Sequence, residues 1–311
     1  MTIKIGISSC LLGNEVRYDG GHKHSTLCTK TLSDFFEFVP VCPEVGIGLP
    51  IPRPAIQLVG CLLAPQAVLS SDHAINYTDR LVKYGQQVVE ETSDLSGYIF
   101  MEKSPSCGLF SVTIHAAEKG CVIGQGRGLY AKVITDAYPF LPVEESGRLE
   151  DLHIRESFIT RVFAYSDWQQ LISKEITQPL LIDFHSRYKY CLMAHDPVKY
   201  LLLGSLLDNV NAICWMDIAQ QYFSALMKSL SQLATQESHT TVLLAIQGYV
   251  KNSLSVDENA ELIKRIDRYR LAEIPLAAVK TFLRHHVKND SNSIMLKQVY
   301  LQAYIQAGAN R

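Results

Sequence analysis

Three cysteines in the first third of the chain stand where a soft metal centre could be held. Cys10, Cys42 and Cys107 each follow an apolar segment that predicts a short β-strand; these segments are residues 3–8, 38–41 and 97–101. Because parallel strands end at one edge of an α/β sheet, the three thiols are expected to converge there. Thiolates select zinc, copper(I) or iron–sulfur clusters. The alternative is that three buried cysteines never meet.

Turn residues surround all three cysteines. Gly13, Gly46 and Gly108 follow the three cysteines within a few residues. Glycine at such positions lets the backbone approach a charged ligand and direct N–H groups at it. Structural zinc sites usually contain cysteines paired two to four residues apart, and this sequence has no such pair. Three isolated thiolates therefore favour a cubane cluster with one open iron, or a catalytic zinc with an open position.

The elements that must position these thiols alternate between strand and helix. Helical patterns follow the strands, and a further strand is expected at residues 67–71; the helical patterns cover residues 31–38, 76–92 and 126–136. Such alternation predicts an α/β fold with a mostly parallel sheet and helices on its faces.

After about Trp168 the strand signals give way to helical periodicity. The expected helices cover residues 180–194, 198–208, 213–233, 240–250, 258–270, 276–286 and 293–307. Asp196-Pro197 and Pro275 mark helix starts. We therefore predict an α/β domain over residues 1–165 and an all-α domain over residues 166–311.

Length and composition agree with two globular domains. The 311 residues are 47% hydrophobic, which supplies enough apolar surface for two cores. The formal charge of −2 argues against a strongly basic protein that coats nucleic acid, although it permits a local basic face. The N-terminus has no signal-peptide layout, and no apolar run reaches the roughly 18 residues of a membrane span. We expect a soluble, cytoplasmic protein.

The other cysteines are not expected to form disulfides in a reducing compartment. Four of them have apolar neighbours and are expected to be small buried residues, namely Cys61, Cys121, Cys191 and Cys214. Cys28 lies in a polar segment and is expected to be an exposed bystander, with a reactive thiol as the alternative.

Five segments resemble the thiouracil desulfidase family (TudS), in the same order and with the same spacing. They are residues 6–13, 16–23, 42–45, 48–54 and 103–108, the last reading Lys-Ser-Pro-Ser-Cys-Gly. The match runs from residue 3 to about residue 145. In the helical half, residues 184–185, 189–190, 192–195 and 203–204 resemble the domain fused to that family in tRNA 4-thiouridine desulfidases (RudS).

The resemblance implies removal of sulfur from a thiocarbonyl without net redox change. It implies a 4Fe–4S cluster held by three cysteines, which correspond to Cys10, Cys42 and Cys107, with one iron left open for the substrate sulfur. Many short members carry a further cysteine where this chain has Val16, so only these three ligands remain. The implied substrate is 4-thiouridine in tRNA, which would give uridine and sulfide.

Within that chemistry, water must attack C4 of the pyrimidine, and a carboxylate near the cluster can take its proton. Glu44, two residues beyond Cys42, is the candidate; a helix cap or an ion pair with Arg53 is the alternative. Ser104 and Ser106 could hydrogen-bond the pyrimidine or relay protons, or form only a turn. Ser9 has a weaker claim of the same kind.

Two sets of residues are candidates for contacts to substrate or RNA. Arg17, Asp19 and Lys23 could contact phosphate or ribose, or form a solvated loop held by an Asp–Arg pair. Residues 166–311 carry 15 Lys+Arg and 13 Asp+Glu, against 14 and 18 in residues 1–165. The helical candidates are Lys280, Arg284 and Lys288, spaced along one helix face, and the cluster of Lys264, Arg265 and Arg268. A solvated helix face is the alternative.

His185, Lys189 and His195 are expected mainly to pack at the domain interface, with RNA contact second. Other functions remain open from the sequence: a desulfidase of free thiouracil, a non-catalytic iron–sulfur or zinc sensor that binds RNA, and a zinc hydrolase.

Overall fold

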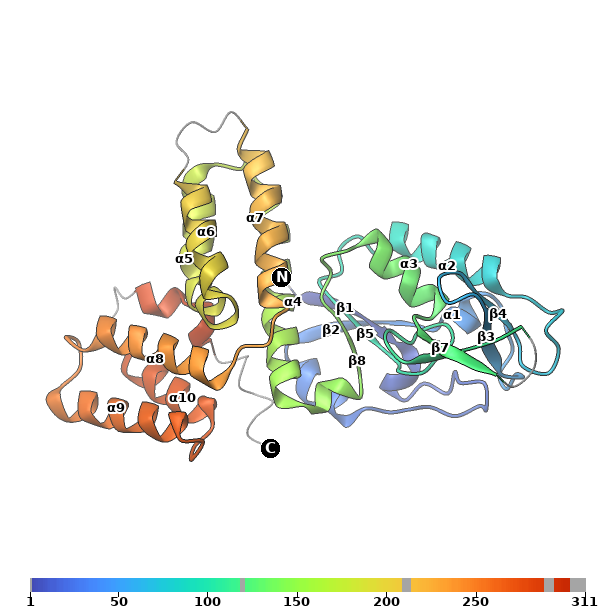
Figure 1. Ribbon diagram of the computed structural model, residues 1–311, viewed down its shortest axis with the longest axis horizontal. Coiled ribbons are helices and arrows are strands. Elements are labelled where there is room, and N and C mark those ends of the chain that lie inside the picture. The colour runs from blue at the N-terminus through green and yellow to red at the C-terminus, as the bar shows by residue number, and fades with distance from the viewer. Residues whose placement is uncertain (1, 118–120, 209–213, 288–293, 303–311) are drawn as a thin grey trace. The chain divides into compact units, whose positions relative to one another are not determined.

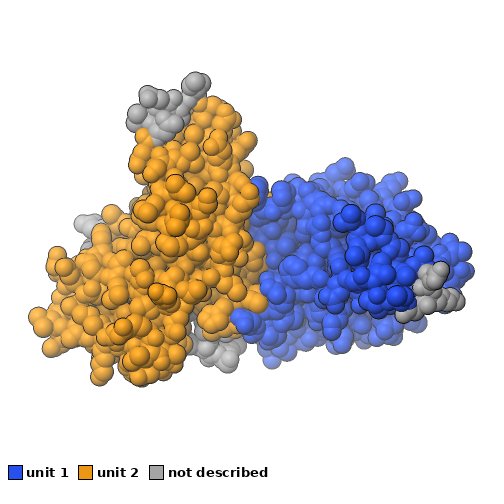
Figure 2. All heavy atoms as spheres, viewed as in Figure 1, with its two compact units in different colours: residues 1–151 blue, residues 152–311 orange. Residues whose placement is uncertain are grey.

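The computed structural model describes residues 2–117, 121–208, 214–287 and 294–302. The chain forms two compact units, Met1–Asp151 and Leu152–Arg311 (Figure 2). The expected boundary at residue 165 lies inside helix α4 (Leu152–Ile172), which is continuous through that position. The predicted order, an α/β unit followed by a helical unit, is confirmed.

Four parallel strands form the first sheet. They lie in the order β2-β1-β5-β8, with bounds β1 (Ile3–Ser8), β2 (Phe36–Val41), β5 (Tyr98–Phe100) and β8 (Val143–Glu145). Ile5 and Ile7 of β1 are fully buried, as expected of a strand covered on both faces. β1 therefore lies between the two strands that precede Cys42 and Cys107, and the three carboxyl ends are neighbours.

A second, mixed sheet was not expected from the sequence. Its order is β4-β3-β6-β7, with bounds β3 (Ile56–Gly60), β4 (Pro65–Leu69), β6 (Val112–His115) and β7 (Val122–Gly126). Two antiparallel hairpins meet where β3 pairs with β6 in parallel. Of these four strands, only β4 overlaps a strand that the sequence predicted. In β7, glycines interrupt the strand and weaken its pattern.

Among its described residues, three α-helices complete the α/β unit: α1 (Pro43–Gly46), α2 (Thr78–Glu91) and α3 (Leu129–Ala137). α2 and α3 lie side by side (Figure 1), and α2 bears out the pattern at residues 76–92. Leu81 and Leu129 from these helices pack with Leu58 and Ile114 of the second sheet. The helix expected at residues 31–38 is replaced by two short helical turns, Leu27–Thr31 and Leu32–Asp34, and then by β2.

Helices account for most of the described residues of the second unit. After α4 come α5 (Gln178–His195), α6 (Pro197–Leu207), α7 (Trp215–Leu230), α8 (Gln236–Val250), α9 (Val256–Arg270) and α10 (Leu276–Val287). Short turns follow at Ile294–Lys297 and Val299–Leu301. Asp196 caps α6 by accepting from the backbone N–H of Lys199, so the helix begins where Asp196-Pro197 predicted. No described helix has both the length and the apolar character needed to cross a membrane.

Aromatic packing and buried ionisable groups mark the interior of the helical unit. The Trp168 ring stacks on Phe223 with centroids 4.8 Å apart and meets Phe184 edge-on at 5.3 Å. Lys280 is only 3% exposed, and its Nζ lies 4.1 Å from the centre of the Tyr300 ring. Burial lowers the pKa of Lys280, and the nearby charge of Glu156 opposes that shift without cancelling it.

Two histidines close to this interior predict acid sensitivity. Burial lowers the pKa of His239 to about 2 and that of His195 to about 4, and the charge of Lys280 acts in the same direction on both. Below about pH 6.5 the two histidines bind protons in the unfolded chain but stay neutral in the folded protein until the pH is much lower. The free energy of unfolding therefore falls as the pH falls below about 6.5.

We expect His239 alone to cost about 2 kcal/mol of stability between pH 7 and pH 5, at about 1.4 kcal/mol per pKa unit. Urea unfolding followed by circular dichroism at both pH values measures this. His239→Gln should keep a partner for the Tyr300 hydroxyl, which lies 2.9 Å from Nδ1, and should flatten the pH dependence. Equal pH dependence in both proteins would contradict the assignment.

Candidate metal centre

The ends of three adjacent parallel strands place three thiols at one cavity. Cys10 lies in a 3₁₀ turn (Ser9–Leu12) directly after β1, Cys42 lies between β2 and α1, and Cys107 lies in the loop after β5. All three line a single cavity of about 470 Å³. The structure thus brings together the three cysteines that the sequence singled out.

Each cysteine is held by its own loop. The carbonyl of Cys10 accepts from the backbone N–H groups of Gly13 and Lys23 at 3.3 and 3.0 Å, and Gly13 has a φ of +91°, a conformation that favours glycine. The carbonyl of Cys42 accepts from Gly46 at 2.8 Å, across the turn that Pro43 opens. The backbone N–H of Cys107 donates to Ser104 Oγ at 3.1 Å. The thiols are therefore positioned by backbone turns.

A buried carboxylate anchors the segment just after Cys107. Oε1 of Glu145, at the end of β8, accepts from the backbone N–H groups of Leu109 and Phe110 at 2.8 and 3.0 Å. Glu145 is 4% exposed. Charge-assisted hydrogen bonds of this kind are strong, so β8 fixes the course of the Cys107 loop.

Three thiols on one cavity are a donor set that fits a soft metal cluster, because thiolates select soft metals. Burial raises the pKa of all three, that of Cys10 to about 11, although the charge of Arg17 opposes the rise there. Thiols in such a site stay protonated until a soft metal displaces the proton. Among the described residues no three His, Cys, Asp or Glu side chains form a group suited to a single metal ion. A cluster does not require one, because each thiolate binds its own iron.

Glu44 lies on the same cavity, in a hydrogen-bonded chain. Its Oε1 accepts from Ser106 Oγ at 2.8 Å, and Ser106 Oγ lies 3.0 Å from Ser104 Oγ. Its Oε2 accepts from Arg53 at 2.8 Å. The ion pair that was the alternative for Glu44 is therefore present, and it coexists with a place on the cavity wall.

Only some of the polar residues expected near the site line the cavity. Ser9, Arg17 and Lys23 line the cavity, whereas Asp19 is not among the lining residues. Arg17 Nε lies 3.6 Å from Asp19 Oδ1, so the Asp–Arg pair that was the alternative exists as well. Ser9 Oγ accepts from the Asn14 amide at 2.8 Å.

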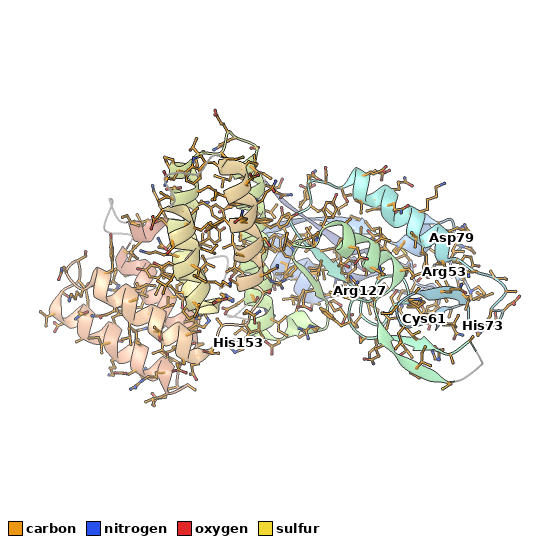
Figure 3. All side chains as sticks on the ribbon, turned by 45° about the horizontal axis from the view of Figure 1, so that its top comes forward. Arg53, Cys61, His73, Asp79, Arg127 and His153 are labelled. Carbon is orange, nitrogen blue, oxygen red and sulfur yellow. The ribbon has the colours of Figure 1, made fainter. Side chains whose placement is uncertain are left out.

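Sequence reasoning missed several residues on the cavity wall. These are Tyr18, Arg53, Glu102 and Lys103. Arg53, labelled in Figure 3, was named only as a partner of Glu44. Glu102 is a second carboxylate, and its Oε2 accepts from Ser146 Oγ at 2.7 Å. The position of Glu102 and Lys103 directly before Ser104 was the signal that could have identified them.

Four of the five remaining cysteines differ from expectation. Cys191 is buried as predicted, but Cys61, Cys121 and Cys214 are exposed. Cys61 and Cys121 lie at strand ends, where apolar neighbours do not imply burial. Cys28, expected to be exposed, is fully buried because its segment forms the helical turn Leu27–Thr31.

The expected basic residues of the helical unit do not form a single exposed row. Lys280 is buried against Tyr300, Arg284 is half-buried and donates to Thr281 Oγ1, and Lys288 lies outside the described residues. On α9, Lys264 is exposed, while Arg265 and Arg268 pair with Glu261 and Glu273 at 2.6 and 3.2 Å. These ion pairs reduce the net charge that the α9 cluster presents.

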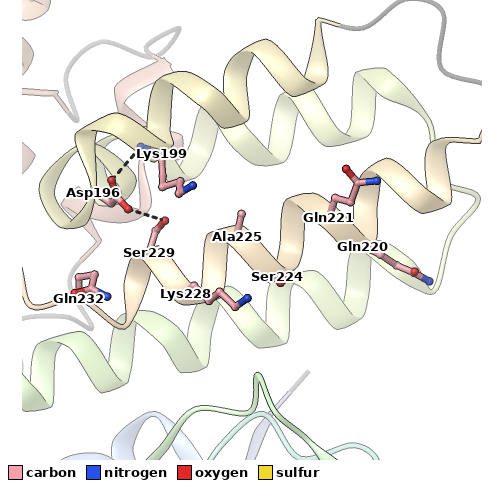
Figure 4. Close-up of a pocket in the computed structure, with 9 residues that line it drawn as sticks. All are labelled: Asp196, Lys199, Gln220, Gln221, Ser224, Ala225, Lys228, Ser229 and Gln232. Atoms are coloured by element: carbon pink, nitrogen blue, oxygen red, sulfur yellow. Dashed lines mark hydrogen bonds between the residues drawn. The ribbon is translucent and has the colours of Figure 1, made fainter.

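A polar groove lies elsewhere on the helical unit, at the start of α6 and along α7 (Figure 4). It has a volume of about 620 Å³, and its lining is rich in amide, hydroxyl and ammonium groups: Lys199, Lys228, Gln220, Gln221, Gln232, Ser224 and Ser229, with Asp196 and Ala225. The Asp196 carboxylate already accepts from the Lys199 backbone N–H at 3.0 Å and from Ser229 Oγ at 3.4 Å.

The three residues left open on α5 lie within the helical unit. His185 stacks on Tyr200 at 5.5 Å and lies 3.1 Å from the Tyr222 hydroxyl. Lys189 Nζ lies 4.7 Å from the centre of the Tyr190 ring. His195 Nδ1 contacts the carbonyl of Gln232. All these contacts are packing and hydrogen bonding inside one unit.

Comparison with known proteins agrees with this division. Residues 5–146 match the family model 2-thiouracil desulfurase, and residues 189–304 match a protein family of unknown function, DUF1722. The uncharacterized protein YbgA of Escherichia coli is 30% identical over 152 residues, which cover 48% of this chain and 89% of YbgA. The uncharacterized protein YbbK of Bacillus subtilis is 31% identical over 116 residues, or 33% of this chain and 71% of YbbK.

One solved structure is also similar, that of the [4Fe-4S]-dependent thiouracil desulfidase TudS. It is 26% identical, with a TM-score of 0.38, over 48% of this chain and 94% of that one. From the two family matches and the two relatives, the chain belongs to the 2-thiouracil desulfurase family through its α/β unit, which is joined to a DUF1722 domain.

Proposed function

We propose that this protein removes sulfur, as sulfide, from 4-thiouridine in tRNA, and that Cys10, Cys42 and Cys107 hold a 4Fe–4S cluster with one open iron. The observation that carries the proposal is the shared cavity: three thiols from three adjacent strand ends and a hydrogen-bonded carboxylate, Glu44, all line it. Membership of the 2-thiouracil desulfurase family supports the reaction type.

The overall change is a hydrolysis. Water adds to the carbon of the C=S group, and hydrogen sulfide leaves, so that C=O replaces C=S and no electrons are gained or lost. An open iron would supply a soft Lewis acid for the substrate sulfur.

Glu44 is the base in this proposal. Its Oε1 takes the proton of the attacking water, because it is the carboxylate oxygen that the Ser106 hydroxyl orients. Ser106 is linked in turn to Ser104, so the two hydroxyls form a path along which a proton can move. Oε2 is held by Arg53 and does not take part.

The tRNA substrate draws support from the helical unit. The groove at α6 and α7 offers lysine, glutamine and serine side chains, which are the types that contact phosphate and ribose in nucleic-acid complexes. A base inside folded tRNA must leave its stack to enter a cavity, as in other enzymes that act on bases.

Free thiols and a tRNA substrate both fit a cytoplasmic location.

We predict that the double variant Lys199→Met/Lys228→Met binds thiolated tRNA more weakly and with less dependence on salt. Each lost phosphate contact lowers the slope of log K against log salt by about 0.9, so the double variant should show a slope smaller by about 1.8. Binding titrations at several salt concentrations measure this. Turnover of free 4-thiouracil should not change.

The matched control removes two exposed lysines of the α/β unit, Lys30 and Lys83. Lys30→Met/Lys83→Met should bind tRNA like the wild type. If this control and the groove variant behave alike, the groove is not the RNA surface. A loss confined to Lys264→Met/Arg268→Met would move that surface to α9.

The function itself is tested by sulfide release from thiolated tRNA and from 2- and 4-thiouracil. We expect the highest kcat/KM on tRNA. Turnover of the free bases alone would favour a thiouracil desulfidase, the second candidate that the family match supports. No sulfide from any thiolated base would favour a non-catalytic RNA-binding sensor.

A further inference from the structure

Arg53 is a buried cation that lies on the cavity wall. Its side chain is only 3% exposed, so water does little to stabilise its charge. Nε donates to Glu44 Oε2 at 2.8 Å, and Nη2 lies 2.8 Å from the same oxygen. Two guanidinium nitrogens thus converge on one carboxylate oxygen, an arrangement that the single ammonium nitrogen of lysine cannot reproduce.

The rest of Arg53 is bound to backbone from two other loops. Nη2 also donates to the carbonyl of Val16 at 2.9 Å, and Nη1 donates to that of Pro50 at 3.3 Å. The backbone N–H of Arg53 donates to the carbonyl of Tyr18 at 2.7 Å. All three guanidinium nitrogens are therefore engaged with protein groups.

The two oxygens of Glu44 are consequently held by two different side chains. Arg53 binds Oε2, while Ser106 donates to Oε1 at 2.8 Å. A carboxylate held at both oxygens cannot rotate freely about its terminal bond. The carbonyl of Val16 links Arg53 to Cys42, because it accepts from Arg53 and also lies 3.7 Å from Cys42 Sγ.

We infer that Arg53 is a positioning residue: it fixes which oxygen of Glu44 faces Ser106, and it ties the Val16–Tyr18 segment of the cavity wall to that carboxylate. The inference rests on the proposed function of Glu44. Arg53 acts through Glu44 and makes no contact with substrate, since its nitrogens already have protein partners. Misplacing a reacting group by about 1 Å can cost 10²-fold in rate, so the effect should be large.

The test is a double-mutant cycle on the holoenzyme, with Arg53→Met, Glu44→Gln and the pair together. We expect Arg53→Met to retain its iron, to lower kcat by about 10²-fold and to leave KM unchanged. The pair should be no slower than Glu44→Gln alone. Losses that multiply would overturn the inference, because Arg53 would then act on its own.

Arg53→Lys covers the case in which Arg53→Met does not fold. It keeps the charge but replaces two donors to Oε2 with one, so kcat should fall less, and again without further loss in the Glu44→Gln background. Arg127→Met, which breaks an exposed ion pair with Asp136 and a hydrogen bond to Thr135 Oγ1 away from the cavity, is the matched control and should behave like the wild type.

A crystal structure of the Arg53→Lys protein tests positioning without any turnover measurement. We expect the Glu44 carboxylate to rotate away from Ser106. An unmoved carboxylate would contradict the inference even if the enzyme were slow. The two proposals can also fail separately. If the wild-type protein releases no sulfide but the Arg53→Lys structure shows the rotated carboxylate, the proposed function is wrong and the positioning role of Arg53 is still supported.

Discussion

Replacing Cys10, Cys42 or Cys107 singly by alanine is expected to abolish both the brown absorbance of the proposed cluster and the proposed release of sulfide. Alanine supplies no ligand, so the cluster would lose one of its three protein anchors. Changes to groups that merely support a ligand already cost about 10–100-fold in metal affinity, and loss of a direct ligand should cost at least as much. Iron and acid-labile sulfide per chain, together with the visible spectrum, measure the effect.

The exposed cysteines provide matched controls for these variants. Cys61→Ala and Cys121→Ala remove a thiol of the same α/β unit away from the cavity and should keep iron, sulfide and activity. If any one of the three cavity variants behaves like these controls, its cysteine is not a ligand. If Cys61→Ala or Cys121→Ala loses the cluster, the ligand set has been misassigned.

Glu44→Gln is expected to keep the cluster and to lower kcat by about 10²–10⁴-fold, the usual contribution of a general base. Glutamine preserves the shape of the side chain and an oxygen that can accept from Arg53, but it cannot take up a proton from water. Iron content and unfolding by urea should be measured alongside, because leaving a buried guanidinium without a charged partner costs about 3–5 kcal/mol.

Glu102 is the rival carboxylate on the same wall. Its Oε2 is occupied by Ser146 and Gly147, at 2.7 and 3.3 Å, and we expect Glu102→Gln to be less harmful than Glu44→Gln. The exposed Glu90→Gln is the control for removing one negative charge. A wild-type rate in Glu44→Gln together with a large loss in Glu102→Gln would transfer the role of base to Glu102.

The convergence of the three thiols could be predicted because it depends on a simple property of parallel sheets. Strand signals at residues 3–8, 38–41 and 97–101 gave β1, β2 and β5 closely enough to place a cysteine after each carboxyl end. Strand order decides whether such ends are neighbours, and here β1 lies between β2 and β5. Short-range patterns do not contain strand order, so the resemblance to a known family was needed to favour one shared site.

Only one of the two partners of Glu44 lay beyond local reasoning. Arg53 is nine residues from Glu44 and was named as its ion-pair partner from the sequence, whereas Ser106 is 62 residues away, and the mixed sheet that carries the chain from Arg53 onward was not predicted. Its strands are short, and glycines interrupt β7, so the alternation that identifies strands was too brief to detect.

Burial was the least predictable property of single residues. Three cysteines with apolar neighbours are exposed, and Cys28 in a polar segment is buried. Lys280 has the spacing of a surface row but faces inward, because α10 contacts the turn at Val299–Leu301 on that side. Helical periodicity located α5 to α10 well, but it gives only the relative angle of residues on a helix and not which face is covered.

The most direct measurement is metal analysis of the protein purified without oxygen. A 4Fe–4S cluster on Cys10, Cys42 and Cys107 predicts about four irons and about four acid-labile sulfides per chain, all lost when any one of these cysteines is replaced. Stoichiometric zinc with no iron and no labile sulfide would contradict the cluster and would point to zinc-dependent hydrolysis.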